Sequence, residues 1–343
     1  MPYWLLPLLV YTCFVEAPPL SNPGPRESAN LIYFPPTKKM VLVDGFVLHP
    51  DSGRNEVWSW DGNNWTVQEN KGPDTKTLSS GAFDSKLRQI VVFGGVGKRG
   101  YESLHGDAWA FDGNNWKKEN TNPIGTRDHH KMVYADHLDA FVMYGGQDSL
   151  RKNDSTTWLL KDSKWTKLTI PGPGARYHFG LSYDVARKKV VLYGGYNSQG
   201  LMADTWEFDG NQWQKIDITG PGPRGRFMMT YDSDRKMVLL FGGDVWKKKV
   251  DKSVHPDGEI WDLRGDLWGY DGKQWQKISD QGPARMMAAL GYDPSRKTVV
   301  VYGGGGAMEE TYADTWEFSN GQWIKKEESG AWKWNGSGYE RIK

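Results

Sequence analysis

One pattern recurs six times along the chain and limits the folds that it can form. Tryptophans stand in pairs seven positions apart, and each pair follows an apolar run that ends in a small doublet. The pairs are Trp58/Trp65, Trp109/Trp116, Trp158/Trp165, Trp206/Trp213, Trp268/Trp275 and Trp316/Trp323. Successive doublets, from Asp44-Gly45 to Gly303-Gly304, are 50, 51, 49, 48 and 61 residues apart. Self-similarity at a fixed period of this length indicates a repeat architecture.

Two further markers keep register with the doublets. An aromatic residue stands eleven positions before each doublet: Tyr33, Phe83, Tyr134, Tyr183, Tyr231 and Tyr292. A basic residue stands eighteen positions before it: Arg26, Lys76, Arg127, Arg176, Arg224 and Arg285. Each copy therefore predicts four short strands: one from the basic to the aromatic residue, one in the apolar run, and one at each tryptophan. Asp, Asn and Gly between the tryptophans favour tight hairpins, because they tolerate positive φ.

This combination of an apolar strand, a glycine doublet and a later tryptophan resembles the kelch repeat, over about residues 24–325. The resemblance implies an all-β fold, a β-propeller of four-stranded antiparallel blades around a central channel. Six copies imply six blades, with seven as the alternative. Residues 326–343 carry aromatics with the spacing of one more hairpin. They form either an extra hairpin on the last blade or a closure segment that completes a seventh.

Composition narrows the possible partners and cofactors. The chain has 43 Lys and Arg against 42 Asp and Glu, so it lacks the basic excess typical of nucleic-acid binding, and we predict no nucleic-acid partner. The sole cysteine, Cys13, excludes a cysteine zinc cluster. Some kelch-like propellers of the galactose oxidase superfamily are copper radical oxidases that need a Cys–Tyr cross-link inside the propeller. Because Cys13 precedes the repeats, we predict no copper oxidase, no cofactor and no metal site.

Residues 1–17 include a short apolar run, from Trp4 to Val15. Its length suits a signal peptide better than a membrane span, which needs about 20 residues. This interpretation predicts a secreted or extracytoplasmic protein. The alternative is an N-terminal apolar strand packed on the domain, in a cytoplasmic protein. We predict no membrane span elsewhere in the chain.

The strand order assigns the connections to two faces of the propeller. Those joining the first strand to the second and the third to the fourth are short and alike, and we call their side the turn face. The other connections share the opposite side, the loop face, and differ widely, as in residues 96–106, 147–155 and 244–265. Because function concentrates on variable loops held by a rigid scaffold, we predict a ligand on the loop face, at the channel mouth.

Candidate ligand-binding residues follow from this choice of face. The basic residues stand at the start of the first strand of each copy, on the loop face. They either form a ring of positive charge at the channel entrance or, as the resemblance implies, form hydrogen bonds with the neighbouring backbone. The next positions vary more between copies, and they include Asp128, His129, His130, Tyr177, His178 and Arg226. With Arg127 and Arg176 of the basic series, the histidines, Tyr177 and Arg226 are the candidates for one wall of a binding pocket. The long insertion within residues 242–265 adds Trp246, His255 and Trp261 as a lid or recognition loop. A solvated charged loop is the alternative.

These features favour a monomeric binding module that captures a protein segment or a glycan. The sequence carries no catalytic signature, so catalytic residues stay unknown. The alternative is an enzyme at the channel mouth, because some relatives of this architecture act as sugar-acid isomerases or glutaminyl cyclases. His129 and His178 would then supply acid and base, and Arg176 and Arg226 would anchor a carboxylate. Whether these side chains cluster distinguishes the two hypotheses.

Overall fold

The computed structural model describes residues 21–47, 56–68, 72–73, 76–97, 100–119, 124–253, 258–326, 331–334 and 339–342. The regular structure in these ranges consists of β-strands. They hold no helix long and apolar enough to cross a membrane. The predicted signal segment 1–17 and the candidate His255 lie outside the described residues.

Each repeat copy forms one four-stranded antiparallel sheet, whose strands follow one another in the chain from the inner to the outer edge of the sheet. The first two sheets are β2 (Asn30–Phe34), β3 (Lys39–Val43), β5 (Val57–Trp60), β6 (Trp65–Gln68), and β7 (Ser80–Asp84), β8 (Gln89–Phe93), β11 (Ala108–Phe111), β12 (Trp116–Glu119). The next two are β13 (Lys131–Ala135), β14 (Ala140–Tyr144), β15 (Thr157–Lys161), β16 (Lys164–Leu168), and β17 (Gly180–Asp184), β18 (Lys189–Asn197), β19 (Gly200–Phe208), β20 (Trp213–Ile216). The last two are β21 (Met228–Asp232), β22 (Met237–Phe241), β25 (Leu267–Tyr270), β26 (Trp275–Ser279), and β27 (Ala289–Asp293), β28 (Thr298–Tyr302), β30 (Thr315–Ser319), β31 (Gln322–Lys325).

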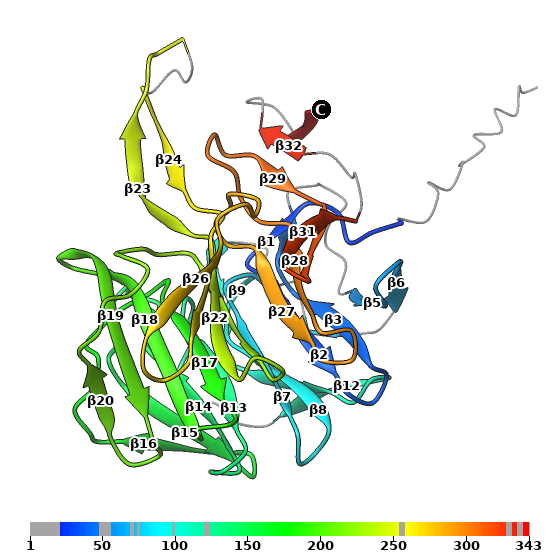
Figure 1. Ribbon diagram of the computed structural model, residues 1–343. Helices are drawn as coiled ribbons and strands as arrows, with labels where there is room; N and C mark the ends of the chain where they lie inside the picture. Colours follow the sequence, from blue (N-terminus) through cyan, green and yellow to red (C-terminus); the bar gives the residue numbers. More distant parts are fainter. Residues whose placement is uncertain are drawn as a thin grey trace, which may run out of the picture.

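The inner strands close into a ring. Strands β2, β7, β13, β17, β21 and β27 contact one another in this order, and β2 also contacts β27. The sheets therefore stand side by side as blades around an axis (Figure 1). The prediction of an all-β propeller built from four-stranded antiparallel blades is confirmed.

Tryptophans of the outer strands pack between neighbouring blades, and a hydrogen bond fixes three of them. Trp213 Nε1 donates to Thr157 Oγ1 of the preceding blade at 2.8 Å, and Trp275 Nε1 donates likewise to Thr205 at 3.0 Å. Trp65 donates to Thr315 at 2.8 Å and so joins the first copy to the last. Where the threonine position holds Val57, Ala108 or Leu267, the facing indole N–H has no hydrogen-bond partner within the described ranges, in Trp116, Trp165 and Trp323 respectively.

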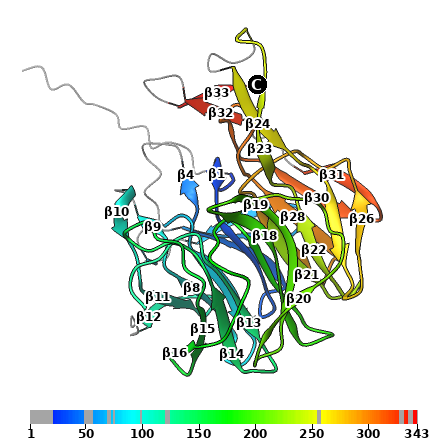
Figure 2. The same cartoon turned by 90° about the vertical axis from the view of Figure 1, so that its left-hand side faces the viewer.

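Short accessory strands extend the connections of the loop face (Figure 2). They are β1 (Arg26–Glu27), β4 (Phe46–Val47), β9 (Val96–Gly97), β10 (Gly100–Leu104), β23 (Asp244–Lys249), β24 (Glu259–Leu263), β29 (Thr311–Tyr312), β32 (Ala331–Trp334) and β33 (Tyr339–Ile342). The C-terminal hairpin β32–β33 pairs with β29, which lies between the second and third strands of the sixth copy. The C-terminal hairpin therefore enlarges the loop face of the last blade.

Candidate functional site

A ring of six equivalent residues narrows the channel at its loop-face end. Each stands two positions after the basic residue of its copy and has φ between 53° and 57°: Ser28, Leu78, His129, His178, Arg226 and Met287. Few non-glycine residues adopt this left-handed conformation. Backbone hydrogen bonds hold it here, as from Arg226 N to the His178 carbonyl at 3.0 Å and from Met287 N to the Arg226 carbonyl at 2.8 Å. The six residues line a cavity of about 30 Å³, which is roughly the size of one water molecule.

The third and fourth copies bring four aromatic side chains together beside this ring. The His129 and His178 rings meet edge to face with centroids 4.2 Å apart. The Tyr177 ring stacks on Tyr196 at 5.6 Å with an interplanar angle of 22°. The His178 ring lies 6.0 Å from the Tyr196 ring. These are the edge-to-face and stacked arrangements that aromatic pairs prefer, so the four rings form one packed group.

Arg226 of the fifth copy joins this aromatic group to the insertion. Its guanidinium carbon lies 4.0 Å from the centroid of the Trp261 ring and 5.5 Å from that of Tyr196. Cation–π contacts of this kind contribute about 0.5–2 kcal/mol each. Arg226 Nη1 lies 3.8 Å from Oδ1 of Asp244, and Arg226 Nε has no hydrogen-bond partner in the described part of the chain. The guanidinium is thus held in place while part of its donor capacity stays unused.

Asp244 fastens the base of the insertion to the aromatic group. The Tyr196 hydroxyl donates to Asp244 Oδ2, and the backbone N–H of Trp246 donates to the same oxygen at 3.2 Å. Burial raises the pKa of Asp244, while the positive charge of Arg226 opposes that shift. Burial and the Asp244 carboxylate together raise the pKa of the Tyr196 hydroxyl, which therefore stays protonated and donates.

The insertion itself is the hairpin β23–β24, which projects from the loop face (Figure 1). Trp261 on β24 is anchored to the sixth copy, because its backbone N–H donates a hydrogen bond to the Ala307 carbonyl at 3.1 Å. The Lys247 ammonium on β23 lies 5.1 Å from the centroid of the Trp261 ring. The hairpin therefore carries both an aromatic face and positive charge next to Arg226.

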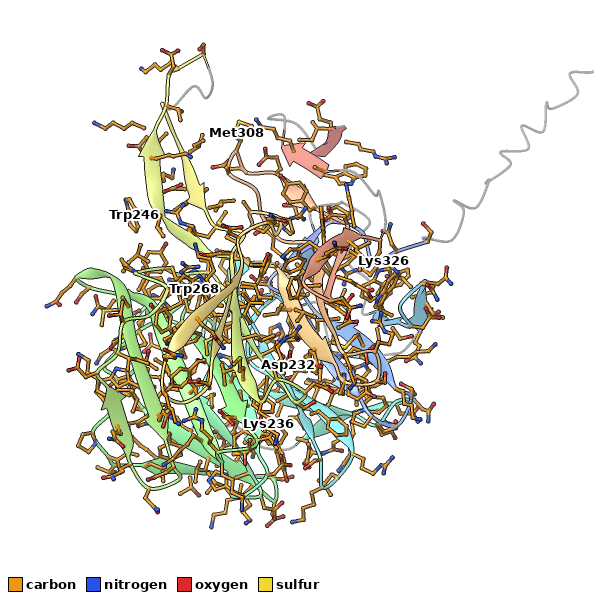
Figure 3. The ribbon with its side chains drawn as sticks, in the orientation of Figure 1. Asp232, Lys236, Trp246, Trp268, Met308 and Lys326 are labelled. Atoms are coloured by element: carbon orange, nitrogen blue, oxygen red, sulfur yellow. The ribbon has the colours of Figure 1, made fainter. Side chains whose placement is uncertain are left out.

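Trp246 is the exposed part of this arrangement. Its side chain is 57% exposed, and its ring centroid lies 5.7 Å from that of Tyr196. Figure 3 shows Trp246 on the lower part of the hairpin, with Asp232 and Lys236 lower in the view. We call this set of residues the loop-face cluster: His129, Tyr177, His178, Tyr196, Arg226, Asp244, Trp246 and Trp261.

Two further titratable groups in or near the cluster, His178 and Glu27, also have shifted pKa values. Burial lowers the pKa of His178 well below its ordinary value, and the nearby His129 and Arg226 act in the same direction. His178 is therefore neutral at pH 7. Burial raises the pKa of Glu27 to about 6, although a hydrogen bond from the Thr311 hydroxyl at 2.9 Å and the charge of Arg226 favour its ionised form.

Three candidates from the sequence lie outside the loop-face cluster. Arg127 and Arg176 are buried, and each donates to the first carbonyl of its own glycine doublet and to an aspartate, Asp154 and Asp204 respectively. These contacts are the backbone-bonding role that the resemblance implied. The His130 ring is buried between blades, and burial lowers its pKa well below the ordinary value. Six candidates, in contrast, meet in one place: His129, Tyr177, His178, Arg226, Trp246 and Trp261.

Sequence reasoning missed Tyr196 and Asp244. Both directly follow a glycine doublet, and both pair through the backbone with the residue after the basic position, as Tyr177 does with Tyr196. Comparing the copies at the position after the doublet would have found them. Among the described residues that follow a doublet, Asp244 and Tyr196 are the two whose side chains contact Arg226.

Within the described ranges, no group of three or more His, Cys, Asp or Glu side chains could hold a metal ion. The site offers aromatic faces, one stacked guanidinium and the imidazole rings of His129 and His178.

Comparisons with known proteins agree with the fold. Residues 90–282 match the family model of the KLHDC2/KLHL20/DRC7 Kelch-repeats domain. The chain is also similar to a solved structure described as the structure of YjhT, with a TM-score of 0.68 and 14% sequence identity. That match covers 90% of this chain and 99% of the other. At this identity the likeness shows a shared fold.

Proposed function

This chain belongs to the KLHDC2/KLHL20/DRC7 kelch-repeats domain family, and from that premise we propose that it captures a segment of a partner protein on its loop face. Kelch-repeat propellers serve in general as binding modules. The contact that carries the finer proposal is the Arg226 guanidinium stacked on Trp261, 4.0 Å from its centroid. This contact couples the insertion to the variable residues of the repeat scaffold.

The chemistry of the loop-face cluster favours a segment in which a carboxylate lies next to an apolar or aromatic side chain. The Arg226 side chain is 16% exposed, and a guanidinium binds carboxylates through paired hydrogen bonds. Exposed Lys247 lies 5.1 Å from the centroid of the same Trp261 ring, and exposed Lys248 and Lys249 follow it along β23. Trp246 offers an exposed ring of the type that dominates binding energy at interfaces. A glycan is the second ligand class, because exposed aromatic rings also stack on sugars.

The enzyme alternative rests on a separate observation. The ring centroids of His129 and His178 lie 4.2 Å apart beside Arg226, so a base and a carboxylate anchor are close together. Burial keeps His178 neutral, but the lowered pKa also means that the ring takes up a proton less readily, which weighs against this alternative. Arg176, the other carboxylate anchor that the sequence suggested, instead donates a hydrogen bond to the Gly194 carbonyl inside its own blade. Under this alternative, His178→Ala abolishes turnover of a sugar acid or of an N-terminal glutamine peptide. A binding module turns over neither.

A displayed peptide library tests the proposal. Peptides selected on the wild-type protein are measured by fluorescence polarisation against Arg226→Gln and Trp246→Ala. The matched control is Arg88→Gln, because Arg88 is an exposed arginine on the turn face. We expect at least tenfold weaker binding in the two cluster variants, since hydrogen bonds to charged groups contribute about 1.5–3 kcal/mol, and no change in the control. Equal affinity in all variants would move the site away from the loop face, and a glycan array run in parallel reveals a sugar ligand.

Secretion and a monomeric state complete the proposal. The apolar run within residues 1–17 supports a secreted or extracytoplasmic protein, with a cytoplasmic one as the alternative. N-terminal sequencing of the mature protein tests this: a start near residue 18 supports cleavage, and a start at Met1 contradicts it. Light scattering after size-exclusion chromatography tests the monomer, which predicts a mass near 38.9 kDa for the full chain.

A further inference from the structure

The channel holds a second and larger cavity, which opens at the turn face rather than the loop face. It measures about 370 Å³ and is lined by residues of all six inner strands. Residues of the turns that follow these strands, among them Ser85, Val185 and Pro294, form its rim. Small-molecule pockets in proteins begin at about 300 Å³, so this cavity suits a small ligand.

Lys131 marks the inner end of this cavity. It lines both the 370 Å³ cavity and the small cavity behind the loop-face ring, together with Asn30 and Met228. Its Nζ lies 3.9 Å from Sδ of Met228, which comes from a blade two positions away around the ring. The lysine side chain therefore reaches across the channel and separates the two cavities.

No carboxylate accompanies this ammonium group among the described residues. The charged side chains that line the inner cavity are Lys131 and Arg226, and both are cations. The one carboxylate on the wall of the outer cavity is Asp136, at the rim, where it accepts a hydrogen bond from Ser85. Burial lowers the pKa of Lys131 to about 8, and no acidic neighbour counters the shift. A buried cation without a counter-ion is unfavourable, and an anion in the channel would relieve it.

The walls define the remainder of the ligand. Between Lys131 and the rim stand small or apolar side chains such as Ile32, Ala82, Val133 and Thr230. Six aromatic residues line the cavity toward the rim: Tyr33, Phe83, Tyr134, Tyr183, Tyr231 and Tyr292. A ligand that extends from Lys131 to the rim therefore meets positive charge at one end and apolar or aromatic surface along its length.

We propose that the central channel is a binding site for a small organic monocarboxylate, which enters from the turn face and pairs its carboxylate with the Lys131 ammonium. The site is distinct from the loop-face cluster, and its ligand is a free small molecule rather than a protein segment. Its apolar body lies along the walls near Ala82 and Thr230.

Isothermal titration calorimetry of the full chain tests the site with benzoate, phenylacetate and hexanoate, each compared with its primary amide. We expect at least one carboxylate to bind, and its amide to bind at least tenfold more weakly. Lys131→Met should weaken carboxylate binding by about 10–100-fold, because hydrogen bonds to charged groups contribute about 1.5–3 kcal/mol. Lys152→Met is the matched control, since Lys152 is exposed on the loop face, and it should bind as the wild type does.

A second variant keeps the test independent of the folding of Lys131→Met. Thr230→Phe retains the lysine but fills the channel, and it should abolish binding. The proposal is overturned if none of the three carboxylates binds the wild type more tightly than its amide. It is also overturned if either Lys131→Met or Thr230→Phe binds the carboxylate as tightly as the wild type. Neither result bears on capture of a protein segment at the loop face.

Discussion

A hydrogen bond from a tryptophan to a threonine joins neighbouring blades. We predict that removing this bond in one blade lowers stability, and that introducing its acceptor in another blade does not. Trp213 Nε1 donates to Thr157 Oγ1 at 2.8 Å, and both side chains are buried. Thr157→Val keeps the shape of the side chain but removes the acceptor. A buried donor that loses its partner costs about 1–3 kcal/mol, so the free energy of unfolding should fall by that amount. In a chain of this size the melting temperature should drop by about 1–4 °C.

The reciprocal variant uses a blade that lacks the bond. Val57 is buried at the equivalent position, and the facing Trp116 Nε1 has no hydrogen-bond partner among the residues that the structure describes. Val57→Thr places a hydroxyl where that indole needs an acceptor, so its stability should equal or exceed that of the wild type. Without the contact, the new buried hydroxyl would cost about 1–3 kcal/mol.

Urea unfolding monitored by circular dichroism measures both variants against the wild type. The reasoning predicts a lower midpoint for Thr157→Val and an unchanged or higher midpoint for Val57→Thr. Two midpoints that fall equally would show that side-chain shape, not the hydrogen bond, governs this interface. An unchanged midpoint for Thr157→Val would show that the bond contributes nothing.

Three further predictions concern buried charges. Lys131→Met should raise the free energy of unfolding at pH 7 by about 3 kcal/mol, because burial lowers the pKa of Lys131 from 10.5 to about 8. The native wild type then binds fewer protons than its unfolded chain between pH 8 and 10.5, so the difference in the free energy of unfolding between variant and wild type should shrink across that range. A difference that does not change with pH in urea titrations would contradict this. Glu27→Gln should remove a fall in stability of about 2 kcal/mol as the pH rises from 4.5 to 6, because the folded pKa of Glu27 is raised to about 6; identical pH profiles of variant and wild type by calorimetry would refute it. Arg176→Gln should destabilise the fold by about 3–5 kcal/mol, because it leaves Asp204 without its buried partner, and a loss below about 1 kcal/mol in urea unfolding would argue for a solvent-facing role.

The fold was predictable because its markers are local and repeated. Each tryptophan spacing reflects a hairpin of constant length, and each doublet reflects a turn with positive φ, as at Gly194 and Gly195. Departures were also readable once the copies were aligned. Thr156 stands where the other copies have an acidic residue two positions before the tryptophan, and Trp158 Nε1 accordingly lacks the acceptor that Asp204 gives to Trp206.

The site was predictable only in part, because sequence period does not determine which loops touch. The variable positions after the basic series identified His129, Tyr177, His178 and Arg226, and their proximity follows from adjacent blades. The stacking of Arg226 on Trp261 depends on how the hairpin folds back, which no repeat marker encodes.

Lys131 escaped notice for a different reason. It occupies a strand position where other copies hold Asn30, Ser80, Gly180, Met228 or Ala289. Nothing in a linear sequence shows that this position faces the channel. Arg127 and Arg176, by contrast, were correctly placed on the loop-face side of their strands, but their donors are turned into the blade.

Amide hydrogen exchange on the complex with a library-selected peptide tests the central claim, that the loop-face cluster captures a partner segment. The account predicts slower exchange in the segments around Tyr196, Trp246 and Trp261, and loss of that protection in Arg226→Gln. Protection confined to the short turns of the turn face, or protection that survives in Arg226→Gln, would contradict it.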